Sequence, residues 1–247
     1  MQTLLKTVNL QVSFDGVKAA DGIDLEIHPG EFVAIIGPNG SGKTTFLNLC
    51  TGYVRPSAGS VFLDERNITR LSPRAIAKRG IARTFQLPQL FTGHTLIENV
   101  MMALAARHGF WDPLRPLDRT AWRDEAEGLL RLVDLSEVAE RRSSEMSEGM
   151  RKLTDIVIAM ALKPRLLLLD EPTSGVSASE KFALMETLVA ALRAERVTAL
   201  FVEHDMEIVR RYADRILVWD AGRIMAQGDP ESVLSDPYVL QNVVGIE

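Results

Sequence analysis

Short apolar runs recur along the 247-residue chain, and three of them consist almost entirely of apolar residues. They occupy residues 32–36, 166–169 and 197–202. A strand with apolar side chains on both faces belongs at the centre of a sheet covered on both sides, and such a sheet is usually parallel. The pattern therefore predicts an α/β fold. Shorter strands are predicted at residues 4–10, 23–27, 60–63 and 215–219.

Helical patterns separate these strands. Residues 72–80 start with Ser-Pro and end with Gly, which favour the beginning and the end of a short helix. In residues 122–133 the apolar side chains fall on one helical face. Ser177 and Glu180 have the spacing of a capping box, which predicts a helix with Ser177 as its N-cap.

Residues 87–165 differ in kind from their surroundings. They contain no convincing strand and read as helical, apart from a loop at Gly109–Pro116 that proline and glycine interrupt. Their 11 basic and 12 acidic residues give no cationic excess. We interpret this segment as a helical lobe inserted into a core formed by residues 1–86 and 166–227. Residues 228–247 are predicted to form a polar tail with a short helix, so that the whole chain is one domain.

Composition places the chain among ordinary globular proteins, with 46% hydrophobic and 25% charged residues. Its 28 Lys and Arg residues against 33 Asp and Glu residues give a net charge of −5, which makes general nucleic-acid binding a poor interpretation. The single cysteine, Cys50, excludes an intrachain disulfide bond.

No stretch has the roughly 18 uninterrupted apolar residues that a membrane span requires. The nearest candidate, residues 156–169, is interrupted by Lys163, Pro164 and Arg165. The N-terminus lacks the charged head and long apolar run of a signal peptide. We therefore expect a soluble, cytoplasmic protein that contacts a membrane only through a partner.

The sequence GPNGSGKTT follows the first central strand and matches the phosphate-loop pattern G-x-x-x-x-G-K-[ST]. Its glycines let backbone N–H groups surround an anion at the N-terminus of the next helix. We expect Lys43 to reach the β- and γ-phosphates, Thr44 to bind Mg²⁺ and Thr45 to contact the α-phosphate. The nucleotide-binding residues predicted here are Gly37, Pro38, Asn39, Gly40, Ser41, Gly42, Lys43, Thr44 and Thr45.

A second apolar strand ends in two carboxylates, Asp170 and Glu171. Acidic residues after a strand are common in loops, but beside a phosphate loop they acquire specific roles. Asp170 is expected to hold the metal through its water shell. Glu171 is expected to polarise the attacking water as a general base. Together the two motifs predict an ATPase that uses Mg²⁺.

The order of motifs along the chain resembles that of the ATP-binding subunits of ABC transporters. It runs from the phosphate loop at 37–44 through Gln86 in RTFQ, SEG at 147–149 and LLLLDE at 166–171 to His204 in VEHD. The resemblance covers nearly the whole chain, and the ordered set is more specific than the phosphate loop, which many NTPase families share. It implies a P-loop NTPase core with a small N-terminal antiparallel β region and an inserted helical lobe.

The resemblance also implies roles for individual residues. Gln86 would approach Mg²⁺ and the attacking water, His204 would bond the γ-phosphate, and Phe14 would stack on adenine. Ser147 and Gly149 would face the ATP bound to a second ATPase subunit. From the residues alone, other interpretations stay open: Gln86 as an ordinary loop residue, His204 as a structural histidine and Phe14 as part of the core.

The sequence departs from the family pattern in two places. The family usually shows a serine, two glycines and a glutamine where this chain has Ser147, Glu148, Gly149 and Met150. Glu148 puts an anion near the expected position of the partner's γ-phosphate unless its side chain turns away, so the departure bears on the rate of hydrolysis. Ser177 stands where the family often carries an aspartate that faces the other subunit.

The resemblance implies a working assembly. Two ATPs would close a head-to-tail dimer of ATPase subunits, either a homodimer or a pair with a paralogue. The dimer would drive transmembrane permease subunits at the cytoplasmic face of the membrane. The RTFQ loop, the following LFTGHTLIENV and the tail look like those of the branched-chain amino-acid and urea importer ATPases. In that group the permease and a separate solute-binding protein select the substrate.

Three alternative functions share part of this motif set. A non-transport ABC ATPase usually carries a long coiled-coil insertion or two ATPase units, and neither is visible here. A soluble P-loop kinase would not explain Gln86, the SEG motif and His204 together. An ATP-gated dimerisation module with low turnover stays open because of Glu148.

Overall fold

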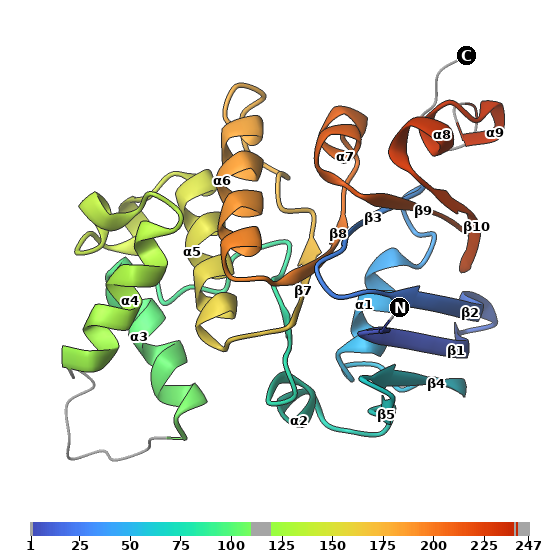
Figure 1. Ribbon diagram of the computed structural model, residues 1–247, viewed down its shortest axis with the longest axis horizontal. Helices are drawn as coiled ribbons and strands as arrows, with labels where there is room; N and C mark the ends of the chain where they lie inside the picture. Colours follow the sequence, from blue (N-terminus) through green and yellow to red (C-terminus); the bar gives the residue numbers. More distant parts are fainter. Residues whose placement is uncertain (1, 110–119, 240, 242–247) are drawn as a thin grey trace.

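The computed structural model describes residues 2–109, 120–239 and 241, and these form two sheets with helices around them (Figure 1). Most of the loop predicted at Gly109–Pro116 lies outside the described residues, as does the end of the tail predicted at 228–247. In the described part of the chain, no helix is long and apolar enough to cross a membrane.

The larger sheet has six strands in the order β10-β9-β3-β8-β7-β6, and all neighbouring pairs except β10–β9 are parallel. The apolar runs therefore form the parallel central strands that the sequence predicts. The strands are β3 (Phe32–Ile36), β6 (Ile81–Arg83), β7 (Leu166–Asp170), β8 (Thr198–Val202), β9 (Arg215–Asp220) and β10 (Arg223–Gly228).

Two of these strands, β6 and β10, were not predicted from the sequence. Strand β6 has only three residues, which is too short for a period to be visible. Strand β10 lies at the sheet edge, and its residues alternate between exposed and half-buried, so it lacks the apolar run on which the prediction depended.

The smaller sheet is antiparallel, as expected, with strand order β2-β1-β4-β5. Strands β1 and β2 are longer than predicted, because they continue through polar residues whose side chains face solvent. Asp15 and Gly16 join them, with φ values of 48° and 85° that suit a tight hairpin. The strands are β1 (Leu5–Phe14), β2 (Val17–Ile27), β4 (Ala58–Leu63) and β5 (Arg66–Asn67).

Helices α3, α4 and α5 form a lobe at one end of the molecule, away from the smaller sheet (Figure 1). As predicted, α4 turns the apolar face with Trp122, Ala126 and Leu130 inward. The helices are α1 (Lys43–Cys50), α2 (Pro73–Ala77), α3 (Leu96–Arg107), α4 (Thr120–Arg131), α5 (Glu148–Ala161), α6 (Lys181–Ala194), α7 (Met206–Tyr212), α8 (Pro230–Leu234) and α9 (Pro237–Val239).

The six-stranded sheet separates two hydrophobic cores. Phe32, Ala34 and Ile36 of β3 face a core shared with α5, α6 and the helical lobe. The alternate residues Val33 and Ile35 face a core shared with α1 and the smaller sheet. Because one core runs from the sheet into the lobe without a break, the lobe is packed on the sheet rather than tethered to it.

The capping box predicted at Ser177 is wrong. Helix α6 begins at Lys181 with Glu180 as its N-cap, and no side chain caps it. The Ser177 hydroxyl donates to the Glu180 carboxylate at 2.7 Å instead of accepting from a backbone N–H. The Ser177 carbonyl accepts from the backbone N–H of Glu180 and Lys181, so these residues form turns ahead of the helix.

Candidate active site

The phosphate loop connects β3 to α1 and is enclosed by backbone. A Cβ atom at Gly42 would lie 2.1 Å from the carbonyl oxygen of Ala19, and the φ of Gly42 is 107°. A Cβ at Gly37 would lie 2.0 Å from the carbonyl oxygen of Trp219. No other residue fits at either position, because the neighbouring strands leave no room and the backbone of Gly42 is left-handed.

The Lys43 side chain is buried inside this loop. Its ammonium donates to the carbonyl oxygens of Gly37 and Pro38, each at 2.8 Å. Burial lowers the pKa of Lys43, while the carboxylates of Glu171 and Asp170 act in the opposite direction. The ammonium is therefore held at the loop by carbonyls, without a direct carboxylate bond, and is available to a phosphate group.

The remaining loop residues differ in exposure. Asn39, Gly40 and Thr44 are exposed, while Pro38 and Thr45 are half-buried. The hydroxyl of Ser41 is buried and has no hydrogen-bond partner among the described residues.

Thr44 and Asp170 meet beside the loop. The Thr44 hydroxyl lies 3.4 Å from Asp170 Oδ1, a distance at the long end for a hydrogen bond. A hydroxyl and a carboxylate are the oxygen ligands that Mg²⁺ prefers, and Mg²⁺ usually completes its shell with phosphates and water. Among the described residues, no group of three or more His, Cys, Asp or Glu side chains could hold a metal by itself. The pair therefore fits a metal that arrives with a nucleotide.

Three predicted catalytic residues converge at the end of β7. Gln86 Nε2 donates to Glu171 Oε2 at 2.8 Å, and His204 Nε2 lies 3.0 Å from Glu171 Oε1. The register of the sheet explains the meeting with His204, because Asp170 pairs with Val202 at the ends of β7 and β8. The Glu171 carboxylate is thus held between a side-chain amide and an imidazole, next to the residues that fit a metal.

Two buried charged residues that support this cluster were not singled out in the sequence. Glu203 accepts from the backbone N–H and the hydroxyl of Thr173, at 3.0 and 2.7 Å, and fixes the segment after β7 to the end of β8. Arg83 bonds Asp170 at 2.8 Å and Asn48 at 2.5 Å. Their sequence signal is weak: each is a single charge beside an apolar strand.

The SEG motif lies at the start of α5, in the helical lobe. Ser147 is the N-cap of this helix, and its hydroxyl accepts from the Met150 N–H at 3.3 Å. The Glu148 carboxylate turns along the helix and pairs with Arg151 at 2.9 Å. A Cβ at Gly149 would meet only side chains at ordinary distances, so packing within this chain does not demand a glycine there.

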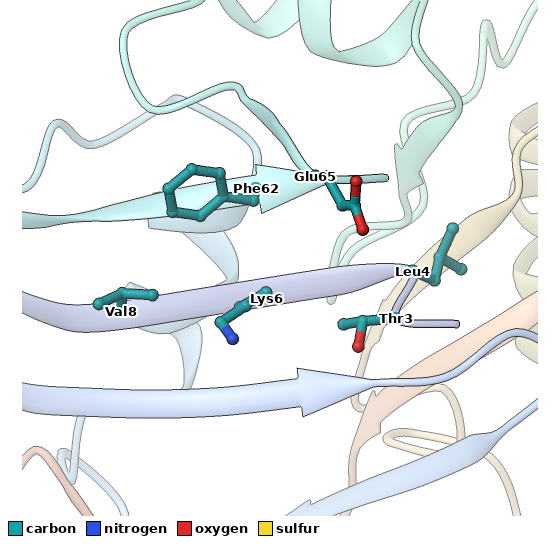
Figure 2. Close-up of a pocket in the computed structure, with 6 residues that line it drawn as sticks. All are labelled: Thr3, Leu4, Lys6, Val8, Phe62 and Glu65. Atoms are coloured by element: carbon teal, nitrogen blue, oxygen red, sulfur yellow. The ribbon is translucent and has the colours of Figure 1, made fainter. Parts of the chain in front are cut away.

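Phe14 ends strand β1 at the hairpin, and 48% of its surface is exposed. It is therefore not a core residue, and the interpretation of Phe14 as core is wrong. Figure 2 shows a separate hollow on the smaller sheet, between β1 and β4. Its lining includes none of the predicted nucleotide-binding residues.

The sequence model of the ABC transporter family matches residues 20–174. The chain belongs to the ABC transporter family. LivG of Escherichia coli K12, a high-affinity branched-chain amino acid transport ATP-binding protein, is 35% identical over 99% of this chain and 98% of its own length. BraF of Pseudomonas aeruginosa, which carries the same description, is 36% identical over 98% of both chains.

Solved structures agree with this assignment. A nucleotide-free ATP-binding cassette from an ABC transporter superimposes with a TM-score of 0.87 at 31% identity, and 99% of each chain is covered. A cassette dimer bound to ADP and Pi superimposes with a TM-score of 0.77 at 25% identity, over 92% of this chain and 99% of the other. The cassette is therefore an ATP-binding, ATP-hydrolysing subunit with the expected P-loop NTPase fold.

Proposed function

We propose that the cassette hydrolyses MgATP to drive import of a branched-chain amino acid, or of urea, through a membrane transporter. The convergence of Gln86 and His204 on the Glu171 carboxylate carries the catalytic part of this proposal. The substrate class rests on the relatives LivG and BraF, whose names state branched-chain amino acid transport.

The site residues divide the work of hydrolysis. Lys43 and the backbone N–H groups of residues 39–45 bind the phosphates. Thr44 and Asp170 would hold Mg²⁺, with Gln86 nearby, and the metal would neutralise charge on the phosphates. Glu171 accepts a proton from the attacking water.

Access to the γ-phosphate requires a rearrangement of the Glu171 cluster. His204 and Gln86 both bond the Glu171 carboxylate. When ATP binds, His204 transfers its bond to the γ-phosphate and Gln86 turns toward the water and the metal. Both oxygens of Glu171 are then released and one of them can accept the proton of the water, so the nucleotide itself activates the base.

A complete site needs a second ATPase subunit. Ser147 and Gly149 of one chain would face the ATP of the other, which is supported by their place at the N-terminus of α5. Because Glu148 pairs with Arg151, its charge is drawn along the helix and away from that N-terminus. This geometry favours an ATPase over a dimerisation module with low turnover.

We further propose the division of the chain and its partners. Residues 1–86 and 166–227 form the ATPase core, residues 87–165 the helical subdomain and residues 228–247 the tail. The helical subdomain and residues 84–89, the Gln86 loop after β6, would contact the permease subunits at the cytoplasmic face of the membrane, while a solute-binding protein delivers the substrate.

The test is Glu171→Gln in the full-length chain. We expect ATP hydrolysis to be lost and light scattering to show a dimer with ATP but not with ADP. Glu195→Gln, an exposed position after α6, is the matched control and should behave as the native chain does. Unchanged hydrolysis by Glu171→Gln would refute the assignment of the base. Uptake of labelled leucine against labelled urea, in vesicles that contain the whole transporter, decides the substrate class.

A further inference from the structure

Lys152 is a buried lysine that the proposed reaction does not use. It lies on α5, one and a half turns after Ser147, and only 5% of its surface is exposed. Its ammonium donates to the backbone carbonyl of Glu171 at 3.0 Å and approaches that of Gln86 at 3.4 Å. One side chain of the helical lobe therefore contacts the main chain of two predicted catalytic residues.

This arrangement is costly, because burying an ammonium requires the loss of its hydration. Burial lowers the pKa of Lys152, and carboxylates act against that effect, those of Glu148 and Glu203 most strongly. An apolar side chain at this position would avoid the cost of desolvation. The ammonium instead donates to carbonyl groups at the end of β7 and in the Gln86 loop, which indicates a role other than hydrophobic packing.

The next turn of α5 holds the same loop from a second side. Asp155 Oδ1 accepts from the backbone N–H of Gln89 at 3.3 Å, and the backbone of Phe85 also donates to this carboxylate. Asp155 is buried as well. Helix α5 thus binds a carbonyl of the Gln86 loop through Lys152 and two N–H groups through Asp155. A displacement of the helix should therefore move the loop with it.

The backbone conformation of Glu171 makes its side-chain direction sensitive to the contact with Lys152. Its φ of 52° is left-handed, which is strained for a residue with a side chain. Its N–H donates to Val202, and its carbonyl accepts from the N–H of Ser174 as well as from Lys152. A shift of the Lys152 ammonium would therefore turn the peptide group from which the Glu171 side chain projects.

We propose that Lys152 is a positioning residue that couples the location of α5 to the orientation of the Glu171 carboxylate. The inference rests on the proposed function, in which Ser147 at the start of α5 meets the ATP of the other subunit. The five residue steps from Ser147 to Lys152 span about 7.5 Å of helix, a distance over which a helix moves as a rigid body. Closure at one ATP would thus set the base that acts on the other ATP.

The first experiment is Lys152→Met in the full-length chain, with Lys163→Met as the matched control. Lys163 follows α5, and 71% of its side chain is exposed. For Lys152→Met we expect kcat to fall by about tenfold or more while KM for ATP stays within about threefold. ATP-dependent dimerisation, measured in the Glu171→Gln background, should be retained. Lys152→Arg should recover part of the lost kcat, because it restores a buried cation.

A kcat within about twofold of the native value in Lys152→Met would overturn the proposal. An equal loss of kcat and of dimerisation would also overturn it, because it indicates general damage to the fold. If Lys152→Met does not fold, Lys152→Gln retains a donor without the charge and takes its place in the same comparison.

The coupling itself is tested by a double-mutant cycle with Ser147→Ala. If Lys152 transmits the engagement of Ser147, the two substitutions together should lower kcat less than the product of their separate effects. Multiplicative effects would show that the residues act independently, which contradicts the inference. The Glu171→Gln variant distinguishes failure of the coupling from failure of the proposed function: if it abolishes hydrolysis while Lys152→Met does not alter kcat, the proposed function stands and only the coupling fails.

Discussion

Arg83 and Asp170 form an ion pair in the interior, with 2.8 Å between Nη2 and Oδ2 and only 5% and 7% of the two side chains exposed. The same guanidinium bonds Asn48 on α1, and its carbon lies 5.3 Å from the centre of the Phe85 ring. Arg83 therefore joins the helix after the phosphate loop to the strand that carries the metal-site carboxylate. The pair occupies one oxygen of Asp170 and leaves Oδ1 facing Thr44.

Removal of the Arg83 guanidinium should lower the stability of the fold. We predict that Arg83→Met lowers the free energy of unfolding by about 3–5 kcal/mol, because the Asp170 charge is left buried without its partner. The measurement is urea denaturation at neutral pH. The exposed pair Arg193–Asp214 offers a control, since Arg193→Met should cost no more than about 1 kcal/mol. Equal effects of the two substitutions would contradict the structural role of Arg83.

Two glycines of the phosphate loop should respond differently to alanine. At Gly42 the new Cβ would meet the Ala19 carbonyl at 2.1 Å, whereas at Gly40 it would meet nothing within 4 Å. Gly42→Ala should therefore abolish ATP binding, measured by calorimetry. In Gly40→Ala the only cost is the strain of a side-chain-bearing residue at a φ of 77°, about 1–2 kcal/mol, so this variant should retain ATP binding with reduced affinity. Tight ATP binding by Gly42→Ala would contradict the close approach of Gly42 to the Ala19 carbonyl.

Phe14 is predicted to contribute to recognition of the base. Loss of an aromatic stacking partner costs about 1–3 kcal/mol per base, so Phe14→Ala should weaken ATP binding by about tenfold. Binding of tripolyphosphate, which has no base, should be unchanged. Val17→Ala at the other side of the hairpin, where 69% of the residue is exposed, is the control. A parallel loss of affinity for both ligands would count against stacking.

Asp155 should make stability depend on pH. Burial raises its pKa from 3.8 to about 6, so the folded chain binds this proton more tightly than the unfolded chain does. The resulting stabilisation is fully present below pH 3.8 and is lost as the pH rises through about 6. The loss amounts to about 3 kcal/mol.

The measurement is the free energy of unfolding from pH 4 to pH 8, compared with Asp155→Asn, which cannot titrate at this position. The advantage of the native chain over the variant should shrink as the pH increases. A constant difference across this range would mean that Asp155 titrates at its usual pKa in the folded chain.

The features that could be predicted are those specified by neighbouring residues in the sequence. The phosphate loop and the strands around 32–36 and 166–169 are specified by contiguous residues, so the sequence shows them directly. The capping box at Ser177 failed because a serine hydroxyl can bond a carboxylate as readily as a backbone N–H, and only the tertiary structure decides between them.

The supporting charges could not be found in the same way. Arg83, Lys152 and Glu203 are single charged residues, and residues of this type are usually exposed. Their partners lie far away in the sequence. The register of β7 with β6 and β8 brings Arg83 and Glu203 to theirs, and the packing of α5 brings Lys152 to the carbonyls of Gln86 and Glu171. The resemblance to ABC transporter subunits supplied the functional residues, whereas the residues that position them became visible only in three dimensions.

The phosphate loop is also tied to both sheets by main-chain atoms. The carbonyl of Ser41 accepts from the N–H of Gly222 at 2.8 Å, and the carbonyl of Gly222 accepts from the N–H of Asp21 at 2.8 Å. Gly222 cannot carry a side chain without strain, because its φ is 76° and a Cβ would lie 2.7 Å from the carbonyl oxygen of Lys18. Chain length at 19–21 and 221–223 matters as well, because main-chain atoms make the contacts. A single-residue insertion in β2 at 19–21 or in the turn at 221–222 would shift the scaffold of the nucleotide pocket, so tags, labels and loop grafts belong elsewhere on the molecule.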